Sequence, residues 1–187
     1  MDELMTSWIA LYQDPMFLLF PVMTLALSVG SFLLFALPWT ILAWLDPLWA
    51  RPYKIQQKPF QVGRYFLPNL ARITLNTTIM LLALILVWPL LRLSSVHLGE
   101  VPPWYVWVLQ ITFFLIMDDF LFYWMHRYMH ENKWVLKHIH SVHHRIKNTC
   151  ALDGNYFHWV EFVLIGSLAM VGPVILGSHL YIIYAWI

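Results

Sequence analysis

The sequence of 187 residues has little charge, few glycines and a single cysteine. Charged residues make up 11% of it and hydrophobic ones 60%, which is too apolar for a protein that folds in water. A net charge of +1 provides no basic field for DNA or RNA, so we expect no nucleic acid partner. The lone Cys150 excludes an internal disulfide and a cysteine-ligated cluster. No Gly-x-Gly-x-x-Gly motif occurs, so the sequence lacks the fingerprint of a dinucleotide-binding site.

Long uncharged runs predict an all-α integral membrane protein: one helical bundle, over residues 1–187, of about four to five membrane segments. Residues 16–45 are long enough for one tilted span or for two shorter pieces separated at a proline. Residues 73–125 are predicted to form a helical hairpin, and residues 162–187 an incomplete second hairpin. Because the last run is too short to recross the bilayer, we expect either a longer natural protein or an incomplete form.

Two basic blocks separate these runs. Residues 51–72 contain five Lys or Arg and no acid, interleaved with aromatic residues, which is typical of a segment in the membrane interface. Residues 126–161 form a polar, histidine-rich helical region with five further Lys or Arg. Basic residues favour the cytosolic side of a membrane, and the two-span hairpin between the blocks returns the chain to the same side. We therefore expect both blocks to face the cytosol.

Seven of the nine histidines fall within 33 residues. His126 and His130 are four residues apart, which places their imidazoles about 40° apart on one helix face. His140, His143 and His144 spread over about 100° of a helix, which suits two ligands to one metal ion and a third to another. A single histidine at a membrane edge is more often interfacial or hydrogen-bonded, but five at these spacings predict a metal site.

Three further polar residues are candidates for contacts around that site. Asp119 lies close to His126 and His130 on the helical wheel but about 10 Å and 16 Å away along the axis. We expect it to accept a hydrogen bond from an imidazole on a neighbouring helix, or to pair with an arginine such as Arg127 or Arg145. His158 and Glu161, three residues apart, are expected to meet and to border the same pocket.

These motifs resemble those of the fatty acid hydroxylase and sterol desaturase superfamily of membrane non-haem iron oxygenases. The first pattern is Asp119-x3-Tyr123-Trp124-x-His126-Arg127-x2-His130, followed by His140-x2-His143-His144. Within the family the chain is most similar to C-4 methylsterol oxidases, through Tyr53-Lys54-Ile55-Gln56 before Lys58-Pro59, Pro103-Trp104-Tyr105, and Asn155-Tyr156-Phe157-His158-x2-Glu161. Trp159 departs from the family's His-Pro-x-Glu element, and the family's final His-x2-His-His box is missing from these residues.

The resemblance implies two non-haem iron ions, held by a first box at His126 and His130 and a second at His140, His143 and His144. It implies O2-dependent oxidation of lipid C–H bonds, most closely the C-4 methyl groups of sterol precursors, with other sterol desaturase or fatty acid hydroxylase activity as the alternative. Electrons would come from NAD(P)H through a reductase and a carrier such as cytochrome b5 or a ferredoxin. The expected location is the endoplasmic reticulum in a eukaryote or the cytoplasmic membrane in a bacterium.

Two other classes of function stay open. A truncated, catalytically inactive membrane protein would keep a partial metal site and associate with a full-length partner. A histidine-lined transporter is disfavoured, because the imidazoles lie in a polar block beyond the apolar segments, whereas transport sites tend to lie near the middle of the bilayer.

Overall fold

The computed structural model describes residues 2–55 and 62–187 and confirms an all-α membrane bundle. Three helical runs in the described residues are long and apolar enough to cross a membrane: Pro15–Leu45, Arg64–Leu91 and Trp104–Glu131. They contain 31, 28 and 28 residues. At about 1.5 Å per residue each exceeds the roughly 30 Å of a hydrocarbon core. The later apolar segment Trp159–Ala169 is shorter than these three runs.

The first run is one continuous helix and not two pieces. It consists of α2 (Pro15–Phe17), a π-helical turn at Leu18–Val22, and α3 (Met23–Leu45). Pro21 lies in the π-helical turn, whose wider i→i+5 hydrogen bonding tolerates a residue that lacks an N–H group. The proline predicted to break the run is thus accommodated inside it.

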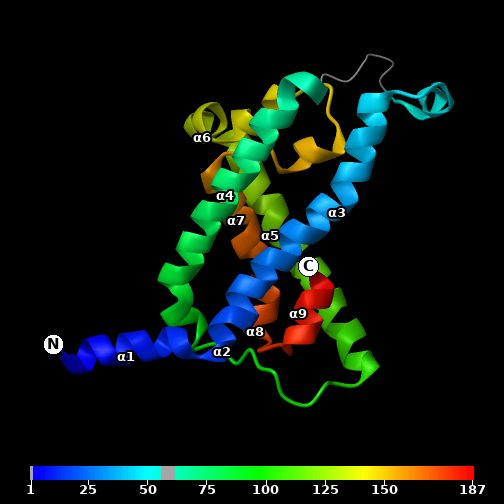
Figure 1. Cartoon of the computed structure of the whole chain (residues 1–187). Helices are drawn as coiled ribbons and strands as arrows, with labels where there is room; N and C mark the ends of the chain where they lie inside the picture. Colours follow the sequence, from blue (N-terminus) through cyan, green and yellow to red (C-terminus); the bar gives the residue numbers. More distant parts are fainter. Residues whose placement is uncertain (1, 56–61) are drawn as a thin grey trace.

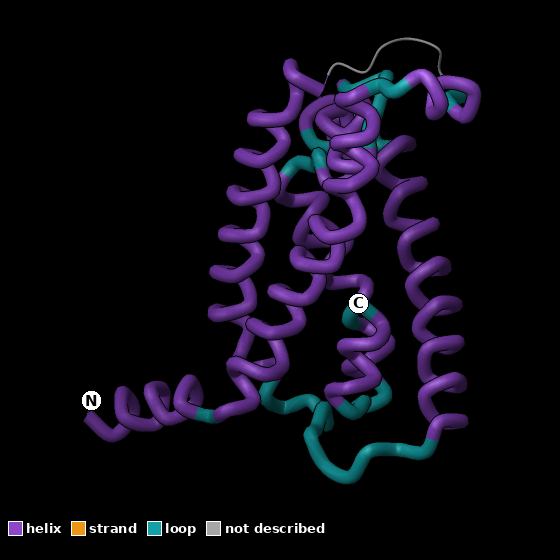
Figure 2. Tube along the Cα trace, turned by 45° about the vertical axis from the view of Figure 1, so that its right-hand side comes forward, coloured by secondary structure: helices purple, strands orange, loops and turns teal. Residues whose placement is uncertain are grey.

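Helix α1 (Asp2–Gln13) lies across the end of the bundle, roughly at right angles to the long helices (Figures 1 and 2). Two hydrogen bonds attach it to the second long helix. The Tyr12 hydroxyl donates to the carbonyl oxygen of Ile85 over 3.0 Å, and Trp88 Nε1 donates to that of Leu11 over 2.8 Å. Helix α1 is therefore fixed to the bundle at the end opposite to α6, the short helix Lys133–His138.

Helix α4 (Val62–Leu91) begins eleven residues earlier than the predicted run from residue 73. Part of the expected interfacial segment 51–72 is therefore helical, and its Arg64 and Arg72 belong to α4. The predicted place of this segment in the membrane interface stays a prediction, and a helix can carry arginines in its first turns where it emerges from the apolar layer. Residues 56–61 of that segment lie outside the described residues.

The C-terminal part of the chain enters the bundle and then reverses. Helices α7 (Trp159–Ala169) and α8 (Val171–Ile175) pack on α5 (Trp104–Glu131), and α7 also contacts α4. Gly177 then adopts a left-handed conformation (φ 56°) against Ser95, where a side chain would clash with the backbone. Helix α9 (Leu180–Trp186) follows, and its buried residues join the core around Trp88.

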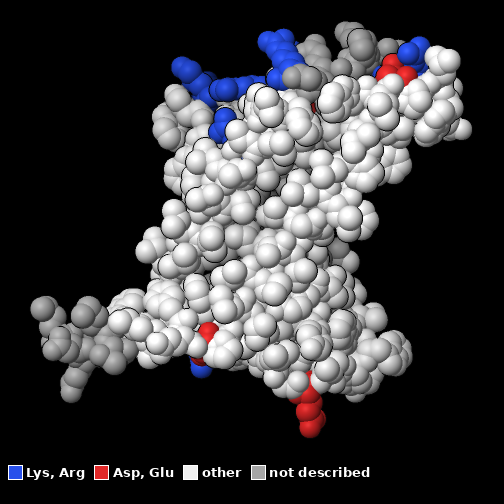
Figure 3. Space-filling model, in the orientation of Figure 1, with Lys and Arg blue, Asp and Glu red and all other residues white. Residues whose placement is uncertain are grey.

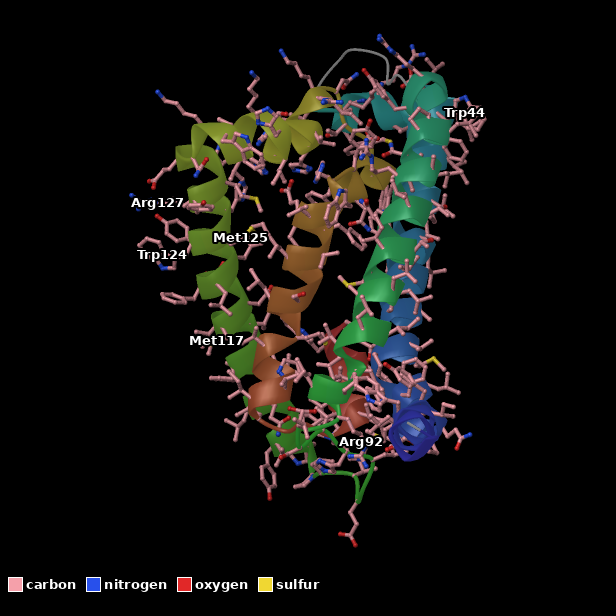
Figure 4. All side chains as sticks on the ribbon, turned by 90° about the vertical axis from the view of Figure 1, so that its left-hand side faces the viewer. Trp44, Arg92, Met117, Trp124, Met125 and Arg127 are labelled. Carbon is pink, nitrogen blue, oxygen red and sulfur yellow. The ribbon has the colours of Figure 1, made fainter. Side chains whose placement is uncertain are left out.

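Positive charge is concentrated at one end of the bundle. Lys and Arg side chains gather around the end that carries α6, whereas Arg92 lies at the other end (Figures 3 and 4). There Arg92 forms an ion pair with Asp14. The two basic blocks of the sequence thus lie at the same end of the long helices.

Candidate metal centre

The histidines converge because the chain reverses after α5. His126 and His130 lie on successive turns at the C-terminal end of that helix. Asn132 then ends α5 and begins α6, since its side-chain oxygen accepts hydrogen bonds from the backbone N–H groups of Trp134 (3.0 Å) and Val135 (3.1 Å). The reversal carries the next segment, a 3-10 helix at His140–Arg145, back over the end of α5.

Four of the five predicted ligands lie together. The Nε2 atoms of His126 and His130 are 3.0 Å apart, those of His130 and His140 3.1 Å, and those of His140 and His144 2.9 Å. One ligating atom from each of the four residues lies within 4.8 Å of every other. His140 is buried, whereas His130 and His144 are exposed. We call these residues the four-histidine cluster.

Hydrogen bonding alone does not account for these contacts. Each Nε2 has a single in-plane position, which holds either a proton or a lone pair. Each Nε2 can therefore take part in only one well-directed hydrogen bond, so three successive close contacts among four such atoms allow at most two hydrogen bonds and leave the third contact without one. A cation resolves this, because all four lone pairs can then point inward. With metal–nitrogen bonds of about 2.1 Å, two nitrogens lie about 3.0 Å apart when the nitrogen–metal–nitrogen angle is 90° and about 4.2 Å apart when it is 180°. The spacing of about 3 Å between neighbouring Nε2 atoms therefore fits a metal ion.

Glu161 orients the buried member of the cluster. Its Oε1 lies 2.7 Å from Nδ1 of His140, and both side chains are almost fully buried. A histidine that binds metal through Nε2 carries its proton on Nδ1, and a carboxylate that accepts this proton fixes the ring. Burial raises the pKa of Glu161 to about 7. Burial and the neighbouring histidines, His144 first, lower the pKa of His140 to about 4, so its imidazole stays neutral and able to bind metal.

His143 lies beside the four-histidine cluster rather than in it. Its ring stacks on Phe157 with 4.6 Å between centroids and an interplanar angle of 16°. Its centroid is 6.0 Å from that of His140 and 5.5 Å from that of His144. Burial is the main cause that lowers the pKa of His143. Its predicted role as a metal ligand stays a prediction.

Asp119 shares an open pocket with two of the histidines. The pocket has a volume of about 320 Å³ on α5 and is lined by Asp119, Phe122, Tyr123, His126, Arg127 and His130. Arg127, one of the partners considered for Asp119, has other contacts: its Nε donates to Glu131 over 2.7 Å, and Nη1 lies 3.3 Å from the Tyr123 hydroxyl. Four-residue spacing along one helix makes these nearer partners available. The expected contact of Asp119 with an imidazole or an arginine stays a prediction. Arg127 and Trp124 point away from α7, and Met125 points toward it (Figure 4).

His158 has a different local role from the one expected. Its Nδ1 accepts a hydrogen bond from the backbone N–H of Val160 over 3.3 Å and so caps the start of α7. Glu161 turns instead to His140. The predicted contact between His158 and Glu161 is therefore replaced by two separate contacts, although both residues lie at the start of α7.

Polar contacts from α4 to the segment before α7 were not foreseen from the sequence. Asn69 donates to Asp153, and Asn76 Nδ2 donates to the carbonyl oxygen of Phe157 over 3.1 Å. Both asparagines are buried. The signal was present as two amides seven residues apart, hence on one face of a helix.

Metal affinity should depend on pH through Glu161. In the metal-free protein its carboxyl group holds a proton below about pH 7, because burial raises its pKa from the ordinary 4.5. The raised pKa stabilises the folded protein at low pH, and this contribution to the free energy of unfolding is lost as the pH rises through 7. Metal binding at Nε2 of His140 favours the carboxylate and releases that proton. We expect the affinity for Co²⁺ to rise with pH between pH 5 and 7 more steeply in the wild type than in Glu161→Gln. The difference between the two slopes should be about tenfold in affinity per pH unit, measured by competition with a chromophoric chelator. Equal slopes would show that Glu161 is not coupled to the ligand.

Comparison with known proteins assigns the chain to a family. The fatty acid hydroxylase family model matches residues 111–187, which include every candidate ligand. The chain is 33% identical over 171 residues to a very-long-chain aldehyde decarbonylase of Oryza sativa subsp. indica, covering 91% of this chain and 63% of the relative. It is 34% identical over 139 residues to methylsterol monooxygenase 2-2 of Arabidopsis thaliana, covering 72% and 50%. The chain belongs to the fatty acid hydroxylase superfamily.

The likeness covers only part of each relative. A third relative, methylsterol monooxygenase 2-1 of Arabidopsis thaliana, is 37% identical over 100 residues, which is 53% of this chain and 36% of the relative. The chain thus spans between about a third and two thirds of the length of these relatives. No solved structure matches it.

Proposed function

We propose that this protein is an O2-dependent oxidoreductase that uses non-haem iron to hydroxylate a C–H bond of a membrane lipid. The observation that supports the proposal most strongly is the four-histidine cluster, whose Nε2 atoms approach each other to about 3 Å in three successive contacts, more than the hydrogen bonds that four single-position nitrogens can form. Imidazole ligands suit iron, and iron supplies the redox chemistry that activates O2. Membership of the fatty acid hydroxylase superfamily supports a lipid substrate.

The residues of the chain have three tasks in this proposal. His126, His130, His140 and His144 hold the metal ion, with His143 a candidate for the second ion that the family resemblance implies. Glu161 accepts the Nδ1 proton of His140 and keeps that ring in its binding tautomer. The apolar helices keep the substrate's hydrocarbon body in the bilayer, so that the oxidised carbon meets the site at the end of α5.

Hydroxylation also requires electrons from outside the chain. One atom of O2 enters the C–H bond as a hydroxyl group and the other leaves as water, so each turnover consumes two electrons and two protons. We propose NAD(P)H as the source, through a reductase and a carrier such as cytochrome b5 or a ferredoxin. The basic end of the bundle would face the cytosol, where Lys and Arg are favoured and where such a carrier can reach the cluster (Figure 3).

For the substrate we propose the C-4 methyl groups of sterol precursors, because two relatives that are 37% and 34% identical over 100 and 139 residues are methylsterol monooxygenases. A long-chain aldehyde is the second candidate, since the match to an aldehyde decarbonylase extends over more of the chain. The two substrates differ in shape, because a sterol needs a wide, rigid cavity and an acyl chain a narrow one.

A substrate panel tests the proposal. Membranes containing the full chain, a reductase, an electron carrier and NADPH are supplied with a 4-methylsterol, a long-chain aldehyde or a fatty acid under ¹⁸O2. We expect one ¹⁸O atom in the sterol product and no product from His140→Ala, because that variant lacks the central ligand. Product from the aldehyde alone would favour the second candidate. No labelled product from any lipid, in a protein that retains iron, would contradict the proposed activity.

A further inference from the structure

Asn76 is a buried polar residue in the middle of a membrane-spanning helix. It is 0% exposed, and its Nδ2 atom donates to the carbonyl oxygen of Phe157 over 3.1 Å. A buried amide in an apolar helix costs free energy unless it is hydrogen-bonded, and α4 does not need this side chain for its own backbone. The bond joins α4 to a residue 81 positions later in the sequence.

Phe157, whose carbonyl group Asn76 holds, is connected to the four-histidine cluster in two ways. Its own ring stacks on His143, with 4.6 Å between ring centroids. Toward the C-terminus, His158 caps α7, and Glu161 in the first turn of that helix meets His140 Nδ1 at 2.7 Å. A shift of Phe157 therefore moves the start of α7 and, with it, the carboxylate that orients His140.

The same segment is attached to the long helices at its other end. Asn69, two turns before Asn76 on α4, donates to Asp153, whose second carboxylate oxygen accepts from Cys150 N over 2.7 Å. From α3, the Thr40 hydroxyl oxygen accepts from Leu152 N over 3.0 Å. Side chains of two membrane helices thus hold the chain between the second histidine group and α7, and Asn76 provides the contact nearest to Glu161.

We propose that Asn76 is a positioning residue for the four-histidine cluster: by holding Phe157 it sets the placement of Glu161 against His140. The inference rests on the proposed metal site. It predicts that Asn76 acts on metal retention through Glu161 and has no separate effect once the Glu161 carboxylate has been removed.

A double-mutant cycle on the full chain tests this route. The purified protein is loaded with Co²⁺, and the release of the ion to excess chelator is followed by its visible absorption. We expect Glu161→Gln to accelerate release by about ten- to a hundredfold and Asn76→Leu by about tenfold, the range found when residues that hold metal ligands are replaced. The double variant should release cobalt at the rate of Glu161→Gln alone. The Co²⁺ spectrum of Asn76→Leu should shift toward that of Glu161→Gln.

The matched control is Thr78→Val. Thr78 is exposed on the same helix, and its hydroxyl bonds only to the carbonyl oxygen of Thr74 among the contacts of the described residues, so cobalt release should stay at the wild-type rate. If Asn76→Leu does not elute as a monodisperse protein, Asn76→Ser serves in its place, because its shorter side chain no longer reaches Phe157.

The outcomes separate the two proposals. Multiplicative effects in the double variant, or wild-type release from Asn76→Leu, would overturn the positioning role while the metal site stands. A wild-type protein that does not retain cobalt would overturn the proposed metal site and this inference with it.

Discussion

Replacement of His140 by alanine is expected to reduce the metal affinity of the protein by at least about a hundredfold, the upper end of the loss found for residues that only support a ligand. His140 lies at the centre of the four-histidine cluster, with its Nε2 atom 3.1 Å from that of His130 and 2.9 Å from that of His144. The substitution also removes the partner of the buried Glu161. Iron or cobalt content of the purified protein, determined by mass spectrometry, measures the effect.

His138→Ala is the matched control for that experiment. His138 lies two residues earlier, is exposed, and contacts the carbonyl oxygen of Trp134 over 2.9 Å. We expect its replacement to leave metal content at the wild-type value. Equal metal content in wild type and His140→Ala would refute the four-histidine cluster as a metal site.

The second large effect concerns stability and arises at the other end of the bundle. Trp88 is 1% exposed, packs against the Phe17 ring with 5.5 Å between centroids, and donates to the carbonyl oxygen of Leu11. It belongs to the core that joins α4 to the π-helical turn and to α9. Trp88→Ala should lower the free energy of unfolding by about 3–5 kcal/mol, because a large cavity forms at the meeting point of these helices. Denaturation of the detergent-solubilised protein by SDS measures this loss.

Two further variants distinguish packing from hydrogen bonding at this position. Trp88→Phe keeps most of the ring and loses the N–H donor, so its cost should be about 1 kcal/mol. Trp49→Ala removes a tryptophan that is 66% exposed and should have little effect. A cost for Trp88→Ala no larger than that for Trp49→Ala would show that α9 and α1 do not depend on this core.

Local spacing predicted the part of the site that is set by helix geometry. His126 and His130 face the same way because an α-helix repeats every 3.6 residues, and α5 extends through both. The long apolar runs also predicted the membrane bundle, because length and hydrophobicity can be read from contiguous residues. The family motifs added the expected chemistry, and the family itself is confirmed.

Spacing could not decide which rings of the second group join the first. His140 is turned by Glu161, 21 residues later, and His143 is held by Phe157, 14 residues later. The segment is also a 3-10 helix, so angles taken from an α-helix do not apply. Arg127, one of the partners considered for Asp119, contacts Glu131 one turn away, because spacing along the helix gives direction but does not rank competing partners. Contacts between distant segments set the orientations of His140 and His143, whereas a local contact set that of Arg127.

All members of the four-histidine cluster come from residues 126–144, the end of one membrane helix and the turn that follows it. During synthesis, this stretch leaves the ribosome before Glu161 does. The nascent chain therefore has every nitrogen needed to capture an ion while its last helices are still being made. In the proposed metal site, all four ligating residues are therefore made before the carboxylate that orients His140.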